Sequence, residues 1–208
     1  MTAIAPPNVV LARAGGVAVA PPNVVLARAG GVAVARFAAT NAVAERFFGT
    51  HADGIAQACA AMAERFQEGG RLFVCGDGAQ RSDVAHVVVE FVHPVIVGKR
   101  ALPALPLPEM AGGAAGRALH TLGRDGDLLM LLSAGGLDEA AHDLLATARA
   151  DGLLTLALTG PLTAAVNAAY PFAVPSSDRC IVQETHEMLY HVLWELVHIF
   201  FEHRGARS

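Results

Sequence analysis

Cysteine is scarce in this sequence of 208 residues, which has only Cys59, Cys75 and Cys180. An odd number without a CxxC pair argues against a disulfide framework and against a structural zinc knuckle. The amino terminus also lacks a basic segment followed by an apolar one, so no signal peptide is predicted. These absences together predict a protein of the reducing cytoplasm.

Long apolar runs and clusters of positive charge are missing as well. Hydrophobic residues make up 53% of the chain, but charges or glycines interrupt every stretch of about 18 residues, so no transmembrane helix is predicted. The formal net charge is −4, Lys99 is the only lysine, and no Lys/Arg cluster occurs, which argues against a nucleic-acid surface. A domain this rich in alanine, valine and leucine often buries surface against copies of itself, so a homo-oligomer is expected.

A perfect tandem repeat occupies the amino-terminal part of the chain. Residues 6–20 recur unchanged as residues 21–35, and each copy contains Pro-Pro and Gly-Gly. These dipeptides predict no helix of useful length in either copy. The repeat is interpreted as an ill-ordered extension or as an apolar arm that docks on a partner protein or on another subunit, and we favour the first. The chain is thus divided into an extension, residues 1–35, and a single domain, residues 36–208.

Helices and strands are predicted to alternate through the rest of the chain. Predicted helices comprise residues 36–49, 52–67, a segment that carries His86 and ends at His93, the weak helix 110–122, and residues 138–150, 162–169 and 182–203. Predicted strands comprise residues 72–75, 128–132, 153–158 and 172–174, with residues 101–108 as an edge strand at best. The alternation predicts a three-layer α/β/α sandwich around a parallel sheet of the flavodoxin-like type.

The segment 71–91 carries the most chemistry. A short apolar strand ends at Gly76-Asp77-Gly78 and a helix follows, so that free backbone N–H groups point into a crevice suited to an anion. His86 and Glu90 are four residues apart and share one face of that helix. They could bind a divalent metal or transfer protons, or they could be an ordinary surface pair. A second loop of this kind begins at Ser133, and parallel sheets bind ligands beyond the carboxyl ends of such strands.

Two motifs and the segment between them resemble a known family. The first motif, GDGAQRSDVAHVVVEF, resembles the GNGGSxxDxxHxxxEL segment of sugar isomerase (SIS) domains of the phosphoheptose isomerase group. The second, QETHEMLYH at residues 183–191, resembles that group's QExHxxxxH on the last helix. Between them, GDLLMLLSAGG and LLTLALTG occupy the places of GDxLLxxSTSGNS and a strand ending in ALTG. The resemblance covers residues 36–203 and omits the repeat.

The resemblance implies an aldose–ketose isomerisation through an enediol, on sedoheptulose 7-phosphate in that group. It also implies a homotetramer with zinc sites at subunit interfaces. Carried over residue by residue, the implied zinc ligands are His86, Glu90, Gln183 and His191. Proton transfer falls to Glu90 and His191. Such a reaction needs a base, an acid and stabilisation of an oxyanion, which this set of residues can provide.

The loops that would hold the substrate depart from the family pattern. The residues expected to contact substrate are Gly76, Asp77, Gly78, Gln80, Ser133, Gly135, Asp138 and Gln183. Several hydroxyl groups of the family are absent here and two carboxylates are added, and each lost charge-assisted hydrogen bond costs about 1.5–3 kcal/mol. A phosphoheptose is therefore expected to bind poorly. Three interpretations stay open: an isomerase of a different or less anionic sugar, a non-catalytic scaffold or regulator, and an accessory protein of a biosynthetic or metalloenzyme-assembly pathway.

Three other polar residues have competing interpretations. Asp83 could position His86, or it could interact favourably with the partial positive charge at the start of its helix. His186 could be a ligand or could pack between helices or subunits. His198 is expected to be solvated.

Overall fold

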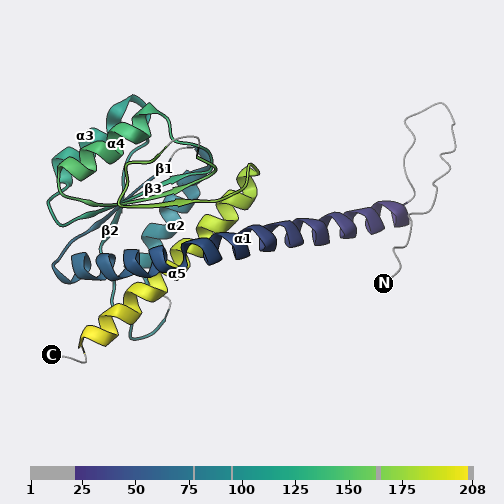
Figure 1. The fold of residues 1–208 in the computed structure, drawn as a ribbon, viewed down its shortest axis with the longest axis horizontal. Coiled ribbons are helices and arrows are strands. Elements are labelled where there is room, and N and C mark those ends of the chain that lie inside the picture. The colour runs from purple at the N-terminus through teal and green to yellow at the C-terminus, as the bar shows by residue number, and fades with distance from the viewer. Residues whose placement is uncertain (1–21, 77, 95, 163–164, 206–208) are drawn as a thin grey trace. The chain divides into compact units, whose positions relative to one another are not determined.

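The computed structural model describes residues 22–76, 78–94, 96–162 and 165–205, and the chain divides into two compact units, Met1–Ala39 and Thr40–Ser208. In the first unit, the described residues are helical. The second unit contains a five-stranded sheet with helices on both faces (Figure 1). Among the described helices, none is both long enough and apolar enough to cross a membrane.

The sheet is parallel throughout and has the strand order β2-β1-β3-β4-β5. Its strands are β1 (Leu72–Gly76), β2 (Ala104–Pro106), β3 (Leu128–Ser133), β4 (Leu154–Thr159) and β5 (Tyr170–Ala173). The apolar run predicted as a doubly covered strand is β3, which lies at the centre of the sheet, and the proline-rich segment supplies the edge strand β2. The predicted three-layer α/β/α sandwich is therefore confirmed.

Each face of the sheet has its own hydrophobic core. Leu72 and Val74 of β1 pack with α1 (Pro22–Gln67), α2 (Arg81–Val92) and α5 (Arg179–Gly205). Phe73 and Cys75 face α3 (Ala114–Leu122) and α4 (Glu139–Ala150) on the other side. Figure 1 shows α3 and α4 on one side of the sheet and α2 and α5 on the other. Two short 3₁₀ turns, Gly78–Gln80 and Ala111–Gly113, precede α2 and α3. The arrangement places α2 and α5, which carry both motifs, on the same face.

Helix α1 (Pro22–Gln67) is longer than the sequence predicted. One helix of 46 residues replaces the two predicted at 36–49 and 52–67, and it includes Gly30 and Gly31. The prediction of no useful helix in the second repeat copy was therefore wrong, and the first copy lies outside the described residues. Each glycine costs a helix about 1 kcal/mol relative to alanine. Extending an existing helix still gains one hydrogen bond per residue, and Pro22 suits the first helical position.

The short helix predicted at residues 162–169 is not present in its described residues, 162 and 165–169. The backbone N–H of Ala169 instead donates to the hydroxyl of Thr155 at 2.9 Å. This bond ties the segment to β4 just before β5 begins. His198 was also predicted wrongly: its side chain is buried, with Nδ1 2.8 Å from the carbonyl oxygen of Trp194 and Nε2 3.0 Å from that of Arg100.

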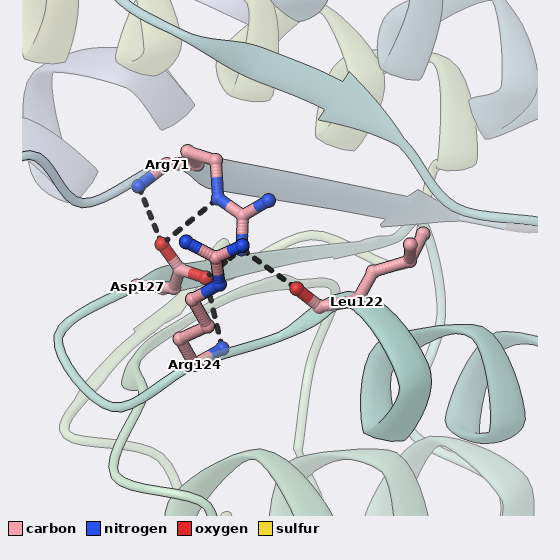
Figure 2. Close-up of polar contacts among 4 residues, drawn as sticks. All are labelled: Arg71, Leu122, Arg124 and Asp127. Carbon is pink, nitrogen blue, oxygen red and sulfur yellow. Dashed lines mark hydrogen bonds and ion pairs between the residues drawn. The ribbon is translucent and has the colours of Figure 1, made fainter.

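A buried carboxylate joins the beginnings of β1 and β3 (Figure 2). Asp127 is 3% exposed, and its Oδ1 accepts from the backbone N–H of Arg71 at 2.7 Å and from its Nε at 3.3 Å. Oδ2 accepts from Nη2 of Arg71 at 2.7 Å and from the backbone N–H of Arg124 at 3.0 Å. The same Nη2 donates to the carbonyl oxygen of Leu122 at 2.6 Å. One side chain thus holds two backbone N–H groups and a guanidinium in place.

His186 is predicted to make folding sensitive to acid. Its Nε2–H donates to the carbonyl oxygen of Thr159 at 3.2 Å, and burial lowers its pKa to about 4. The unfolded chain protonates this ring near its ordinary pKa of about 6.5, whereas the folded protein resists protonation down to about pH 4. The contribution of the neutral ring to the free energy of unfolding is therefore fully present above pH 6.5 and is lost as the pH falls from 6.5 to 4. The free energy of unfolding is expected to fall by about 3 kcal/mol across this window from this group. The measurement is urea denaturation from pH 8 to pH 4.

The variant His186→Gln should show a flatter dependence of the unfolding free energy on pH than the wild type between pH 6.5 and 4. The matched control is His120→Gln, because the side chain of His120 is 78% exposed. The same slope in wild type and His186→Gln would contradict the prediction.

Candidate active site and metal centre

Three side chains from two helices meet at one point beside the sheet. His86 and Glu90 lie on α2 and His191 lies on α5. The Nε2 atom of His86 is 3.5 Å from Oε1 of Glu90 and 3.4 Å from Nε2 of His191. The Nε2 atom of His191 is 3.7 Å from the same glutamate oxygen. Three of the four residues predicted as metal ligands are therefore close together within one chain.

The spacing of these three atoms suits a tetrahedral metal ion. Zinc–ligand bonds of about 2.0–2.2 Å at tetrahedral angles place neighbouring ligand atoms about 3.3–3.6 Å apart. The three observed separations, 3.4, 3.5 and 3.7 Å, lie in or next to that range. Two imidazoles and a carboxylate are also a donor set that zinc accepts, and a fourth position would remain for a further ligand. The residues present fit the ion that the family resemblance implies.

Tyr190 contacts the ring of His86 on its Nδ1 side, opposite the Nε2 atom that faces Glu90 and His191. Its hydroxyl lies 2.9 Å from Nδ1 of His86, and the two rings meet edge to face. If Nδ1–H donates to the phenol oxygen, the lone pair of Nε2 is free to face a cation. Burial raises the pKa of Tyr190, and the nearby Glu187 carboxylate raises it further, so the phenol stays neutral. Sequence reasoning missed this residue, although it directly precedes His191.

Glu187 is a second carboxylate near the site and was also missed. One atom each from His86, Glu187 and His191 lie within 4.8 Å of one another, and Oε1 of Glu187 is 3.8 Å from Nδ1 of His86. Its spacing of four residues before His191 could have indicated it. Glu187 is about half exposed, whereas the side chain of Glu90 is 15% exposed. Glu90 is the better placed of the two to face His86 Nε2.

Gln183, the fourth predicted ligand, lies beside Asp83. Burial raises the pKa of the Asp83 carboxyl, while the amide of Gln183 and the ring of His86 lower it. No hydrogen bond or ion pair joins Gln183 to His86, Glu90 or His191 in the part of the chain that the structure describes. Its role as a ligand stays a prediction.

Part of the predicted substrate set lines a separate cavity of about 230 Å³: Gly78, Gln80, Ser133 and Asp138. Gly76, Gly135 and Gln183 are not among the described residues of its lining. Gly76 ends β1 at a place where a Cβ atom would come 3.0 Å from the carbonyl oxygen of Leu132, so a side chain does not fit. Gly78 has a φ of 58°, which favours glycine. The cavity is lined by Gly78, Gln80, Met110, Leu132, Ser133, Gly136, Asp138, Ala141 and Arg179. Asp77 lies outside the described residues.

The second loop uses its own polar groups. The hydroxyl of Ser133 donates to the carbonyl oxygen of Gly136 at 3.0 Å and accepts from the N–H of Gly135 at 3.3 Å. Asp138 caps α4, because its Oδ1 accepts from the N–H of Ala141 at 2.9 Å. Both side chains are therefore partly committed to holding the loop.

A family model described as SIS domain matches residues 37–160 of the chain. The chain belongs to the SIS domain family. The phosphoheptose isomerase of Thermodesulfovibrio yellowstonii is 31% identical over 183 residues, which cover 80% of this chain and 90% of that protein. That of Desulfovibrio desulfuricans is 30% identical over 179 residues, with coverage of 78% and 84%. This member of the SIS family is therefore phosphoheptose isomerase-like, as the two motifs predicted.

Solved structures confirm the SIS fold. A phosphoheptose isomerase from Francisella tularensis superimposes with a TM-score of 0.67 at 21% identity, covering 80% of this chain and 96% of that one. A phosphoheptose isomerase from Neisseria gonorrhoeae gives a TM-score of 0.68 at 18% identity, with coverage of 81% and 97%.

Proposed function

We propose that this SIS protein is a zinc-dependent aldose–ketose isomerase that acts on a sugar or sugar phosphate through an enediol. The approach of His86, Glu90 and His191 to within 3.7 Å of one another carries the proposal. Their separations suit a tetrahedral ion, and the named activity of the relatives is an isomerisation. Gln183 is the proposed fourth ligand.

The chemistry is divided among these side chains. A bound zinc ion would stabilise negative charge on the substrate oxygen. Oε1 of Glu90 faces the two imidazoles, and its other oxygen is left to take the proton from one carbon and return it to the neighbouring carbon. His191, whose Nε2 would hold the ion, gives the proton on its Nδ1 to the carbonyl oxygen and takes one back from the neighbouring hydroxyl, which completes the exchange. The phenol of Tyr190 fixes the ring of His86, so that its Nε2 stays directed at the cluster.

We also propose that the active protein is a cytoplasmic homotetramer with its sites at subunit interfaces, as the resemblance implies. Val89 and Ile96, on and just after α2, are about half exposed and would be covered in such an assembly. The molar mass in solution tests this point, and a monomer at micromolar concentration would contradict it.

Metal removal should abolish the activity. The chain as purified is expected to contain zinc, measured by elemental analysis, and to isomerise a ketose phosphate. A chelator should remove both zinc and turnover, and added zinc should restore both. Turnover that persists after the zinc is gone would contradict the metal-dependent mechanism, and a zinc-loaded protein without turnover on a panel of phosphorylated and unphosphorylated sugars would contradict the isomerase.

Tyr190→Phe is expected to weaken zinc binding about 10- to 100-fold, because loss of the partner of a ligating histidine frees its ring. Phenylalanine keeps the buried aromatic ring, so the packing of α5 should not change. Competition with a chromophoric chelator measures the affinity. The matched control is Tyr170→Phe, whose hydroxyl donates to the carbonyl oxygen of Gln57 at 3.4 Å. An equal affinity in wild type and Tyr190→Phe would show that the phenol does not position His86.

A non-catalytic scaffold is the second candidate, and the first unit of the chain favours it. Residues 22–39 expose large apolar side chains that suit a protein partner. The exposed fractions are 50% for Val25, 72% for Leu26, 62% for Val32, 71% for Val34 and 69% for Phe37. A partner lost on removal of residues 1–34, with zinc content unchanged, would support this function.

A further inference from the structure

The amino-terminal part of α1 is apolar around its whole circumference. Residues 22–39 contain two charged side chains, Arg28 and Arg36, and the side chains of Leu26 and Phe37 are 72% and 69% exposed. A helix without a polar side is normally buried. A surface that covers this segment is therefore expected.

Leu26 and Phe37 mark the two ends of one face of this helix. They are eleven residues apart, so they differ by only about 20° around the axis and lie about 16.5 Å apart along it. Ala29 and Ala33 lie between them on the same side. Two bulky ends with small residues between them allow the helix axis to come close to a partner surface, and we call this the Leu26–Phe37 face.

The second unit has an apolar groove of matching length. It lies between α2 and β2, has a volume of about 620 Å³, and its α2 wall runs from Arg81 to Val92. These two residues are also eleven positions apart, which is about 16.5 Å of helix. Val88 and Val89 line the groove near its middle, and Val89 is 48% exposed. We call this the α2–β2 groove.

The other wall of the α2–β2 groove is an edge strand that cannot accept a further strand. Leu107, just after β2, donates its backbone N–H inward to the carbonyl oxygen of Val74 at 2.8 Å. Pro106 and Pro108, on either side of it, have no N–H to offer on the open side of the sheet. The groove is therefore suited to the side chains of a docked helix rather than to an added strand.

Both surfaces belong to every copy of the chain, so two copies can exchange helices in a closed pair. Each contact covers about 16.5 Å by about 11 Å, and a reciprocal exchange then buries roughly 700 Å² over all four surfaces. This is the size of a weak interface. It suits a contact that adds to the other subunit contacts of an oligomer, and residues 22–36 precede the part of the chain that the SIS family model matches.

We propose that the Leu26–Phe37 face of one copy docks in the α2–β2 groove of a second copy. The contact holds α2, which carries His86 and Glu90, against a neighbouring subunit. It covers the exposed side chain of Val89, and it gives the second repeat copy a role in assembly. The proposal does not depend on the proposed isomerase activity.

An inter-chain disulfide tests the contact. Ala33→Cys and Val89→Cys lie near the middle of the two surfaces, so the test does not depend on the direction of the docked helix. They are placed on separate copies of the full chain, in which the exposed Cys180 is replaced by serine, and the copies are mixed under mild oxidation. The disulfide is expected to form at least tenfold faster than between Ala33→Cys and Leu122→Cys. Leu122 is the matched control because it is 50% exposed and ends α3 on the other side of the sheet.

Charges placed on the helix test which of its faces docks. Leu26→Glu and Phe37→Glu, added to the Ala33→Cys chain, should each slow the reaction at least tenfold, because each removes an anchor from an apolar groove. Val32→Glu is the matched control: Val32 is 62% exposed but lies about 120–140° around the axis from the two anchors. It should change the rate less than threefold.

Equal rates for Val89→Cys and Leu122→Cys overturn the proposal. A faster reaction when Ala33→Cys and Val89→Cys share one highly diluted chain shows that the groove takes the helix of its own chain, which overturns the second copy. If Val32→Glu slows the reaction as much as Leu26→Glu, the Leu26–Phe37 face is the wrong one. The rates are measured without zinc or sugar, so a chain without turnover can still confirm the contact, and failure of the contact leaves the isomerase unaffected.

Discussion

Glu90→Gln is expected to reduce kcat of the isomerisation by about 10²- to 10⁴-fold, the range for loss of a general base. Glutamine keeps the size of the side chain but cannot take a proton from the substrate. It also replaces the negative charge that lies 3.5 Å and 3.7 Å from the two imidazoles, so zinc should bind more weakly. Assays at saturating zinc separate the two effects. The incorporation of solvent deuterium into the product measures the proton transfer itself.

Glu187→Gln is the matched control for this prediction. Glu187 also lies near His86, but on the Nδ1 side and about half exposed. Its replacement should cost less than about tenfold in kcat, since a solvated carboxylate that does not take the substrate proton contributes little. If Glu187→Gln loses more turnover than Glu90→Gln, the base is assigned to the wrong carboxylate. The reacting carbons would then lie on the Nδ1 side of His86.

The regular elements of the second unit could be predicted because their signals are local. A run such as residues 128–132 has no polar residue to face solvent, so it belongs in the middle of a parallel sheet, where β3 lies. The extent of α1 could not be predicted in this way. Gly30-Gly31 is a common loop signal, yet a pair of glycines inside an alanine-rich helix costs only about 2 kcal/mol. The composition of the dipeptide does not tell which outcome prevails.

Half of the candidate site could be predicted from spacing and half could not. His86 and Glu90 share a face of one helix, so their proximity follows from the interval of four residues. The approach of His191 depends on which side of α5 packs against α2, and a largely apolar helix does not specify this. The family motif supplied that residue. Sequence reasoning missed Tyr190 and Glu187 because both act on His86, which lies on another helix more than 90 positions away in the sequence.

Asp127→Ala is expected to destabilise the fold by about 3–5 kcal/mol, the range for removing one member of a buried ion pair. The substitution leaves the backbone N–H groups of Arg71 and Arg124 without their acceptor at the amino-terminal ends of β1 and β3 (Figure 2). Because the Arg71 side chain is 27% exposed and can reach water, the lower end of the range is expected. For a domain of this size, about 3 kcal/mol corresponds to a fall in Tm of roughly 6–12 °C, measured by calorimetry at fixed protein concentration.

The contrast with an exposed pair shows why this carboxylate matters. Glu109→Ala removes the ion pair between Glu109 and Arg81, whose side chains are 50% and 69% exposed. Surface pairs contribute about 0–1 kcal/mol, so its Tm should change by no more than about 2–4 °C. The two ion pairs have similar N···O distances, 2.7 Å and 2.9 Å. An equal fall in Tm for Asp127→Ala and Glu109→Ala would contradict the prediction. It would mean that Asp127 contributes only an ion pair, and that its hydrogen bonds to the two backbone N–H groups before β1 and β3 add no stability.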